Sequence, residues 1–246
     1  MDSNSSAAGF SADNPGFDEA EWLARQELAC AYRLFDHFGW HELIYNHITV
    51  RVPNSDGHFL INPFGLMYRE VCASNLVKID LDGRIIGESA YPVNPAGFIM
   101  HSAIHAARPD AHAVAHTHTT AGQAVSCQKD GLLPLSFSSM FFTDRVAYHD
   151  FEGITLDRAE RERLAADLGD RNVMILRNHG LLTCGPTLAH AFIDLYQLQR
   201  ACEVQIAAQG GGLAALDDRE GSVLPRLVPA LNNAACYARP SQLDQP

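Results

Sequence analysis

Two long helical segments near the ends of the sequence, separated by short apolar runs, constrain the fold of this chain more than any other feature. In residues 18–38 and 187–208, apolar side chains recur every three or four positions, which is the period of an amphipathic helix. Asp18 is the expected N-cap of the first helix, with Glu21 completing a capping box. Short runs typical of strands lie between them, at 48–52, 58–61, 76–79, 113–116, 145–148, 173–176 and 181–184. This pattern predicts the α/β class, with a mixed sheet.

Three further helices are expected at 94–107, from residue 120, and at 156–168, and the Asp82-Gly83 pair predicts a hairpin into residues 84–86. No repeat or linker divides the sequence, so one domain is the simplest organisation. We expect a disordered leader at 1–17, the folded domain at 18–212, and a C-terminal extension at 213–246 that could pack on a neighbouring subunit.

Charge and cysteine content exclude several classes of protein. The formal net charge of −11 disfavours a nucleic-acid partner or an anionic membrane surface, since both require a basic face. No apolar run reaches the length of a membrane span, and the first residues lack the features of a signal peptide. The six scattered cysteines are typical of reduced thiols. A cytoplasmic protein is therefore expected.

Three histidines carry the strongest indication of chemistry. His116 and His118 follow an expected strand, on which residues i and i+2 point to the same side. His179 stands in an Asn-His-Gly turn directly after the apolar run 173–176. Three neutral imidazoles suit a catalytic divalent metal, because a fourth position stays open for water or a substrate oxygen. Spacing alone is equally compatible with three structural histidines.

Residues 108–118 (RPDAHAVAHTH), followed about 60 residues later by 176–181 (LRNHGL), resemble the class II aldolase/adducin family. The likeness extends from about residue 27 to 211, and the segments YNHIT (45–49), NPAGF (94–98) and VAYHD (146–150) are most similar to its adducin-like branch. The resemblance implies a single-domain, three-layer α/β/α fold around a mainly antiparallel sheet, assembled as a homotetramer. It also implies one divalent metal per subunit on His116, His118 and His179, with Zn²⁺ expected first and Fe²⁺ or Mn²⁺ as alternatives.

The sequence departs from the family pattern where the family's acid/base and phosphate contacts are expected. The position of the catalytic glutamate, four residues before His101, is Gly97, and glycine cannot transfer a proton. The phosphate-binding serines fall on Pro95 and Ala96, the asparagine on His47, and the small hydroxyl residue before Gly65 is Phe64. The pattern therefore predicts a small-molecule substrate without phosphate.

The candidate site residues follow from the matched motifs and their departures. The candidate proton-transfer groups are His101, His47 and Tyr148, and His101 is preferred because imidazole titrates near neutral pH. Candidate substrate-binding residues are Asn46, Phe64, Gly65, Phe98 and Phe142. The phenylalanines could line an apolar pocket or could equally be core packing.

Three functions remain open at this point. The first is a metal-dependent, aldolase-like lyase that acts through a metal-stabilised enolate on a non-phosphorylated hydroxy acid, keto acid or other carbonyl compound. The second is a non-haem Fe(II) oxygenase that cleaves an arylpyruvate-type or other aromatic keto acid, since imidazole ligands suit iron as well as zinc. The third is a non-catalytic, adducin-like binding module.

Overall fold

The computed structural model describes residues 14–153 and 159–211, and its centre is a sheet of seven strands. In chain order the strands are β1 (His47–Arg51), β2 (His58–Ile61), β3 (Val77–Asp80), β4 (Ala113–Thr117), β5 (Val146–His149), β6 (Val173–Leu176) and β7 (Gly180–Gly185). Their order across the sheet is β3-β2-β1-β4-β7-β6-β5. The pair β5 and β6 is parallel, and the other five pairs are antiparallel. The predicted α/β class with a mixed, mainly antiparallel sheet is confirmed.

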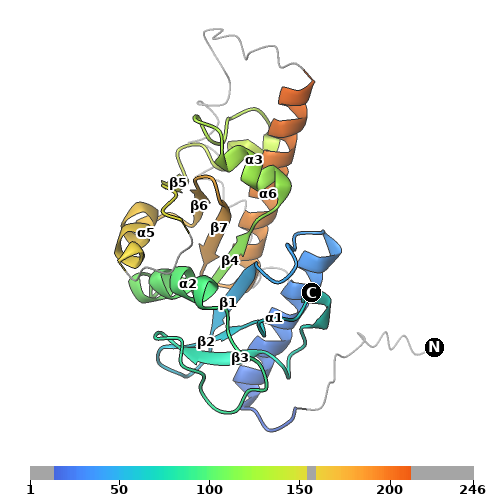
Figure 1. Cartoon of the computed structure of the whole chain (residues 1–246), viewed down its shortest axis with the longest axis vertical. Coiled ribbons are helices and arrows are strands. Elements are labelled where there is room, and N and C mark those ends of the chain that lie inside the picture. The colour runs from blue at the N-terminus through green and yellow to red at the C-terminus, as the bar shows by residue number, and fades with distance from the viewer. Residues whose placement is uncertain (1–13, 154–158, 212–246) are drawn as a thin grey trace, which may run out of the picture.

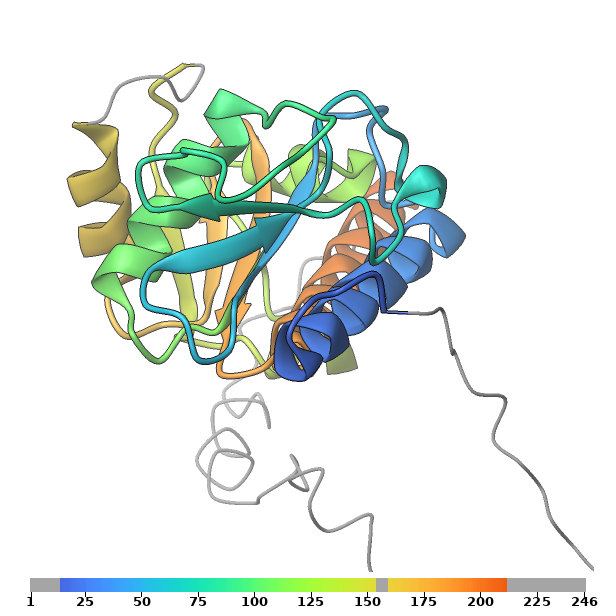
Figure 2. The same ribbon diagram turned by 90° about the horizontal axis from the view of Figure 1, so that it is seen from below.

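Helices cover both faces of this sheet and give three layers (Figures 1 and 2). They are α1 (Glu19–His37), α2 (Pro95–Ala107), α3 (Thr120–Ser126), α4 (Phe137–Met140), α5 (Glu160–Leu168) and α6 (Leu188–Gly210), with a 3-10 turn, η1, at Tyr68–Glu70. The long helices α1 and α6 lie side by side on one face, where α3 and α4 pack against α6. Helices α2 and α5 lie on the other face. None of the helices in the described ranges is long and apolar enough to cross a membrane.

Strand alternation decides which side chains face which helical layer. On β4, Ala113 and Ala115 pack in the core under α1 and α6, whereas Val114 packs in the core under α2 and α5. His116 therefore points to the α2 side, because it lies two residues after Val114. On the neighbouring strand β1, Ile48 packs on the α1 side, so His47 and Thr49 also point toward α2. Histidines from two adjacent strands are thus gathered under one helix.

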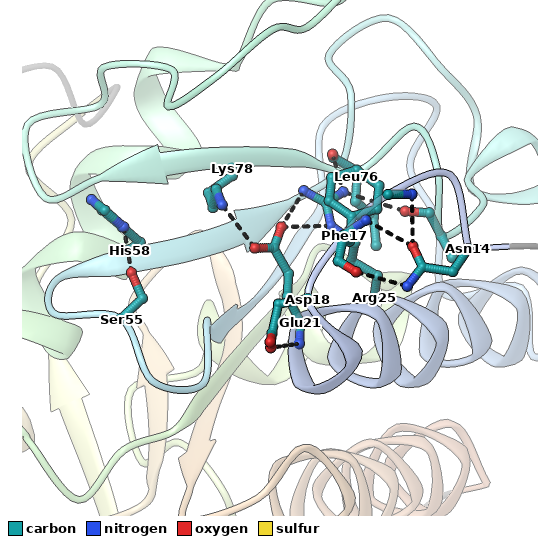
Figure 3. Close-up of polar contacts among 11 residues, drawn as sticks. Asn14, Phe17, Asp18, Glu21, Arg25, Ser55, His58, Leu76 and Lys78 are labelled. Atoms are coloured by element: carbon teal, nitrogen blue, oxygen red, sulfur yellow. Dashed lines mark hydrogen bonds and ion pairs between the residues drawn. The ribbon is translucent and has the colours of Figure 1, made fainter.

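The first turn of α1 differs from the predicted capping box. Asp18 caps the helix as expected, accepting hydrogen bonds from the backbone N–H groups of Ala20 and Glu21. The Glu21 carboxylate instead accepts hydrogen bonds from Arg25, at 2.9 Å, and from Lys78, at 2.7 Å (Figure 3). Burial by itself would raise the pKa of Glu21, but these two cationic donors outweigh it and hold the pKa below its usual range. The ion pair with Lys78 joins α1 to β3, whereas the pair with Arg25 lies within α1.

Several predicted boundaries are corrected by the structure. Residues 84–86 form no strand, and their backbone pairs with β3 at an isolated bridge between Ile79 and Ile85. The helix expected at 156–168 begins at Glu160 within the described residues. In the predicted leader, Phe17 stacks on Trp22 and lies under the Arg25 guanidinium, so Phe17 packs against α1. Most of the leader and the whole extension at 213–246 lie outside the described residues.

Candidate metal centre

The three predicted metal ligands come together at the end of β4 and the turn between β6 and β7. His116 is the fourth residue of β4, and His118 follows its last residue. His179 stands in the turn, after Asn178, whose φ of 55° lies in the left-handed region. A Cβ on Gly180 would lie 2.3 Å from the carbonyl oxygen of Thr117, so a glycine is required for this turn to lie against β4.

The ring nitrogens of these histidines converge on one point. The Nε2 atoms of His116 and His118 are 2.7 Å apart, and those of His118 and His179 are 2.9 Å apart. One candidate ligand atom from each residue lies within 4.8 Å of the other two. The structure therefore gathers three imidazoles from two distant parts of the sequence, as a tripodal metal site requires.

Hydrogen bonds at the other ring nitrogens determine what the Nε2 atoms can do. His116 Nδ1 lies 2.8 Å from the carbonyl oxygen of Leu181, and His118 Nδ1 lies 2.7 Å from a carboxylate oxygen of Glu42. Both oxygens can only accept, so both Nδ1 atoms carry the proton. In the neutral rings the two Nε2 atoms then present lone pairs to each other. Facing lone pairs at this distance repel unless a cation lies between them, so the donor set fits a divalent metal.

Burial keeps these rings neutral and ready to bind a cation. It lowers the pKa of His116 far below its usual value and lowers that of His179 to about 4, and neighbouring imidazoles add to both shifts. Burial also lowers the pKa of His118, although the hydrogen bond to Glu42 opposes it. A metal therefore does not compete with protons for these nitrogens at neutral pH.

Glu42 is a second-layer partner of this centre that the sequence did not indicate. We expect Glu42→Gln to weaken zinc binding by about 10- to 100-fold, because the carboxylate orients His118 and increases its basicity. Competition with a chromophoric zinc chelator would measure the change. Glu27→Gln, an exposed glutamate on α1, is the matched control and should bind zinc like the unchanged protein. Equal zinc affinities for Glu42→Gln and the control would show that Glu42 does not support the metal centre.

His47 fills the space beside Gly97, where the family resemblance places a glutamate. A Cβ on Gly97 would lie 2.0 Å from His47 Nε2 and 2.1 Å from the adjacent ring carbon. The His47 ring is parallel to that of His116, with centroids 6.1 Å apart, and its residue pairs with His116 across β1 and β4. A glutamate at position 97 and a histidine at position 47 could therefore not both occupy this volume.

His101, which is on α2, lies next to His47 of β1. Their ring centroids are 5.7 Å apart in an edge-to-face arrangement. Burial, with a smaller contribution from His105, lowers the pKa of His101 to about 3. This low pKa contradicts the expectation that His101 titrates near neutral pH. The structure nevertheless brings two of the three candidate proton-transfer residues to the histidine centre.

The third candidate, Tyr148, lies elsewhere in the chain. It is on β5, three strands from β4, and its hydroxyl accepts a hydrogen bond from the Leu132 backbone N–H. The Arg177 guanidinium covers its ring at 4.3 Å. Phe142 lines the same cavity, of about 440 Å³, and is buried in the core. Within the described part of the chain, neither residue contacts the three imidazoles, so a single chain does not bring them to the centre.

The other candidate substrate-binding residues have mixed placements. Both polar ends of Asn46 are engaged within the protein: its amide donates to the Trp40 carbonyl, and its oxygen accepts from the His118 backbone N–H. Asn46 therefore positions His118. Phe98 packs in the apolar cluster between α2 and strands β2 and β3. Phe64 is partly exposed, and the neighbouring Gly65 is exposed with a φ of 101° in the loop after β2.

Comparison with known proteins places the chain in a family. Residues 26–206 match the family model of the class II aldolase and adducin N-terminal domain, and the chain belongs to this family. It matches the crystal structure of an aldolase II superfamily protein from Pseudomonas syringae with a TM-score of 0.84 and 53% identity, covering 88% of this chain and 87% of that one. An L-fuculose 1-phosphate aldolase from Glaciozyma antarctica matches with a TM-score of 0.71 and 35% identity, covering 82% and 80%.

The same family includes proteins with a different role. Alpha-adducin from Mus musculus is 50% identical over 205 residues, which represent 81% of this chain and 28% of adducin. The chain thus corresponds to little more than a quarter of adducin's length. Family membership is consistent with an aldolase-like lyase, and the adducin relatives fit a non-catalytic role as well.

Proposed function

We propose that this protein is a divalent-metal-dependent lyase that acts on a hydroxy acid, a keto acid or a related carbonyl compound without a phosphate group. The observation that carries the proposal is the convergence of three Nε2 atoms, two of which must present lone pairs. His116, His118 and His179 would hold one metal ion, with Zn²⁺ expected. A metal bound there supplies Lewis acidity that polarises a substrate carbonyl.

The chain's own residues would provide the rest of the site. Glu42 and the Leu181 carbonyl fix the orientation of two ligand rings. His101 and His47 are the proposed proton-transfer groups, because both are buried beside the centre and no carboxylate stands at position 97. The absence of the family's serines and asparagine, replaced by Pro95, Ala96 and His47, supports a substrate without phosphate. A homotetramer in the cytoplasm remains a prediction from the family resemblance.

The oxygenase and the binding module are kept as competing functions. Three neutral imidazoles also suit Fe²⁺, whose oxygen chemistry does not require the missing glutamate. The identity of 50% with alpha-adducin is the observation that supports the binding module.

Metal analysis of protein purified without chelators distinguishes these functions. We expect about one zinc per chain, together with cleavage of some member of a panel of hydroxy and keto acids without phosphate. If the protein contained iron and took up oxygen with an arylpyruvate, the oxygenase would be the correct function and the lyase would be rejected. Protein that neither retains nor binds a divalent metal would contradict both enzymatic functions and leave the binding module.

A further inference from the structure

Thr49 connects two buried histidines on α2. Its hydroxyl oxygen lies 2.8 Å from His101 Nδ1 and 2.8 Å from His105 Nε2. The three side chains are almost completely buried, so bulk water does not compete for the hydrogen bonds between them. A hydroxyl group has one proton, and it can therefore donate to only one of the two rings.

The backbone carbonyl of Ala111, next to His105, sets the direction of these hydrogen bonds. His105 Nδ1 lies 3.1 Å from the carbonyl oxygen of Ala111, which can only accept, so Nδ1 carries the proton. Burial, reinforced by Arg51, lowers the pKa of His105 to about 3, and the ring is neutral. Its Nε2 is then an acceptor, and Thr49 must donate to it. The Thr49 oxygen consequently accepts from His101 Nδ1–H.

This direction of the hydrogen bonds leaves one free lone pair, on the His101 ring. With its proton on Nδ1, neutral His101 presents a lone pair at Nε2, a buried atom without a hydrogen-bond partner among the described residues. Phe59 stacks on the His105 ring, with centroids 4.3 Å apart, and holds the outer end in place. The Ala111 carbonyl, His105 and Thr49 thus act in sequence on the tautomer of His101.

His47 presents the complementary group. The Asn94 amide nitrogen lies 3.0 Å from His47 Nε2 and donates to it, so the proton of neutral His47 is on Nδ1. That Nδ1 is also buried without a hydrogen-bond partner among the described residues. One unsatisfied donor and one unsatisfied acceptor therefore belong to adjacent rings. Buried polar atoms without partners are rare and mark places where a ligand or water is bound.

We propose that Thr49 and His105 are positioning residues that fix His101 in the Nδ1–H tautomer, so that His101 Nε2 and His47 Nδ1–H together bind the hydroxyl or carbonyl oxygens of the substrate. This inference rests on the proposed function for the identity of the ligand, whereas the tautomers follow from hydrogen bonds within the chain. In the reaction a substrate proton would pass to His101 Nε2. The electron pair left on the substrate oxygen would accept the hydrogen bond from His47 Nδ1–H.

Long-range ¹H–¹⁵N correlation spectra of the full chain labelled at histidine nitrogens test the inference directly, because the two neutral tautomers give different patterns. The spectra of His101→Gln and His105→Gln would assign the two signals. We expect His101 and His105 of the unchanged protein to carry their protons on Nδ1 at pH 7.5. A proton on Nε2 of His101 in that spectrum would overturn the proposal, whatever the variants do.

Substitutions at Thr49 provide the second part of the test. Thr49→Val keeps the side-chain shape and removes the hydroxyl, and we expect His101 to move largely to the Nε2–H tautomer. Thr49→Ser is the matched control and should keep the signal of the unchanged protein. An unaltered His101 signal in Thr49→Val would contradict the positioning role. Zinc content separates this inference from the proposed function. If a protein that binds no metal showed the predicted tautomers, the positioning role of Thr49 and His105 would stand, and the metal-dependent function would be rejected.

Discussion

His116→Ala is expected to weaken zinc binding by at least about 100-fold, since even the loss of a second-layer partner costs 10- to 100-fold. His116 is completely buried and contributes the Nε2 atom that faces His118. The variant would also leave the Leu181 carbonyl without its donor, at a cost of about 1–2 kcal/mol in the free energy of unfolding. The fold should survive this loss, because neighbouring backbone pairs of β4 and β7 remain.

Metal content by mass spectrometry and secondary structure by circular dichroism would measure both effects. His37→Ala is a suitable control, since His37 is exposed at the end of α1 and is not one of the three clustered histidines. We expect the control to retain about one zinc per chain. Undiminished zinc in a folded His116→Ala protein would show that the metal binds elsewhere.

The second large effect is expected at the contact between Gly97 and His47. Gly97→Ala should lower the free energy of unfolding by about 2 kcal/mol, because the added methyl group would overlap a buried imidazole ring. In a His47→Ala background the same change should stabilise the protein by about 0.5 kcal/mol, which is the usual gain for replacing glycine by alanine in a helix. The two sites would then be coupled by about 2.5 kcal/mol, within the range for residues in contact.

Urea unfolding of the four proteins in this double-mutant cycle would measure the coupling. Gly210→Ala is the matched control, since a Cβ at that helical position meets no atom within 4 Å. Its effect should be the same with and without His47. If the effects of Gly97→Ala and His47→Ala were additive, His47 would not occupy the space beside Gly97.

The parts of the fold with strong local patterns could be predicted from the sequence. Strands β2 and β6 lie where the apolar runs place them, and α6 extends two residues beyond its predicted end. Residues 84–86 could not be interpreted correctly, because a hairpin signal specifies a turn and not the number of strand pairs that follow it. The 3-10 turn η1 and helix α4 are too short to give a periodic signal.

The site residues that lie within a recognisable motif could be predicted from the sequence. Their hydrogen-bond partners from distant segments could not. The three metal ligands lie within the HTH and NHG motifs, whereas Glu42 and Thr49 reach the centre through pairings that no local pattern encodes. Phenylalanine in a family motif does not distinguish a pocket from a core, and the structure places Phe98 and Phe142 in apolar clusters. Tyr148 shares a motif with His149 but lies on the far edge strand.

A crystal structure of the zinc-loaded protein, with anomalous data collected on both sides of the zinc absorption edge, tests the metal centre most directly. The geometry predicts one anomalous peak per chain, about 2.1 Å from the Nε2 atoms of His116, His118 and His179. His118 Nδ1 should keep its hydrogen bond to Glu42 in that structure. A zinc peak at other residues, or rings of these three histidines turned away from one another, would contradict the assignment.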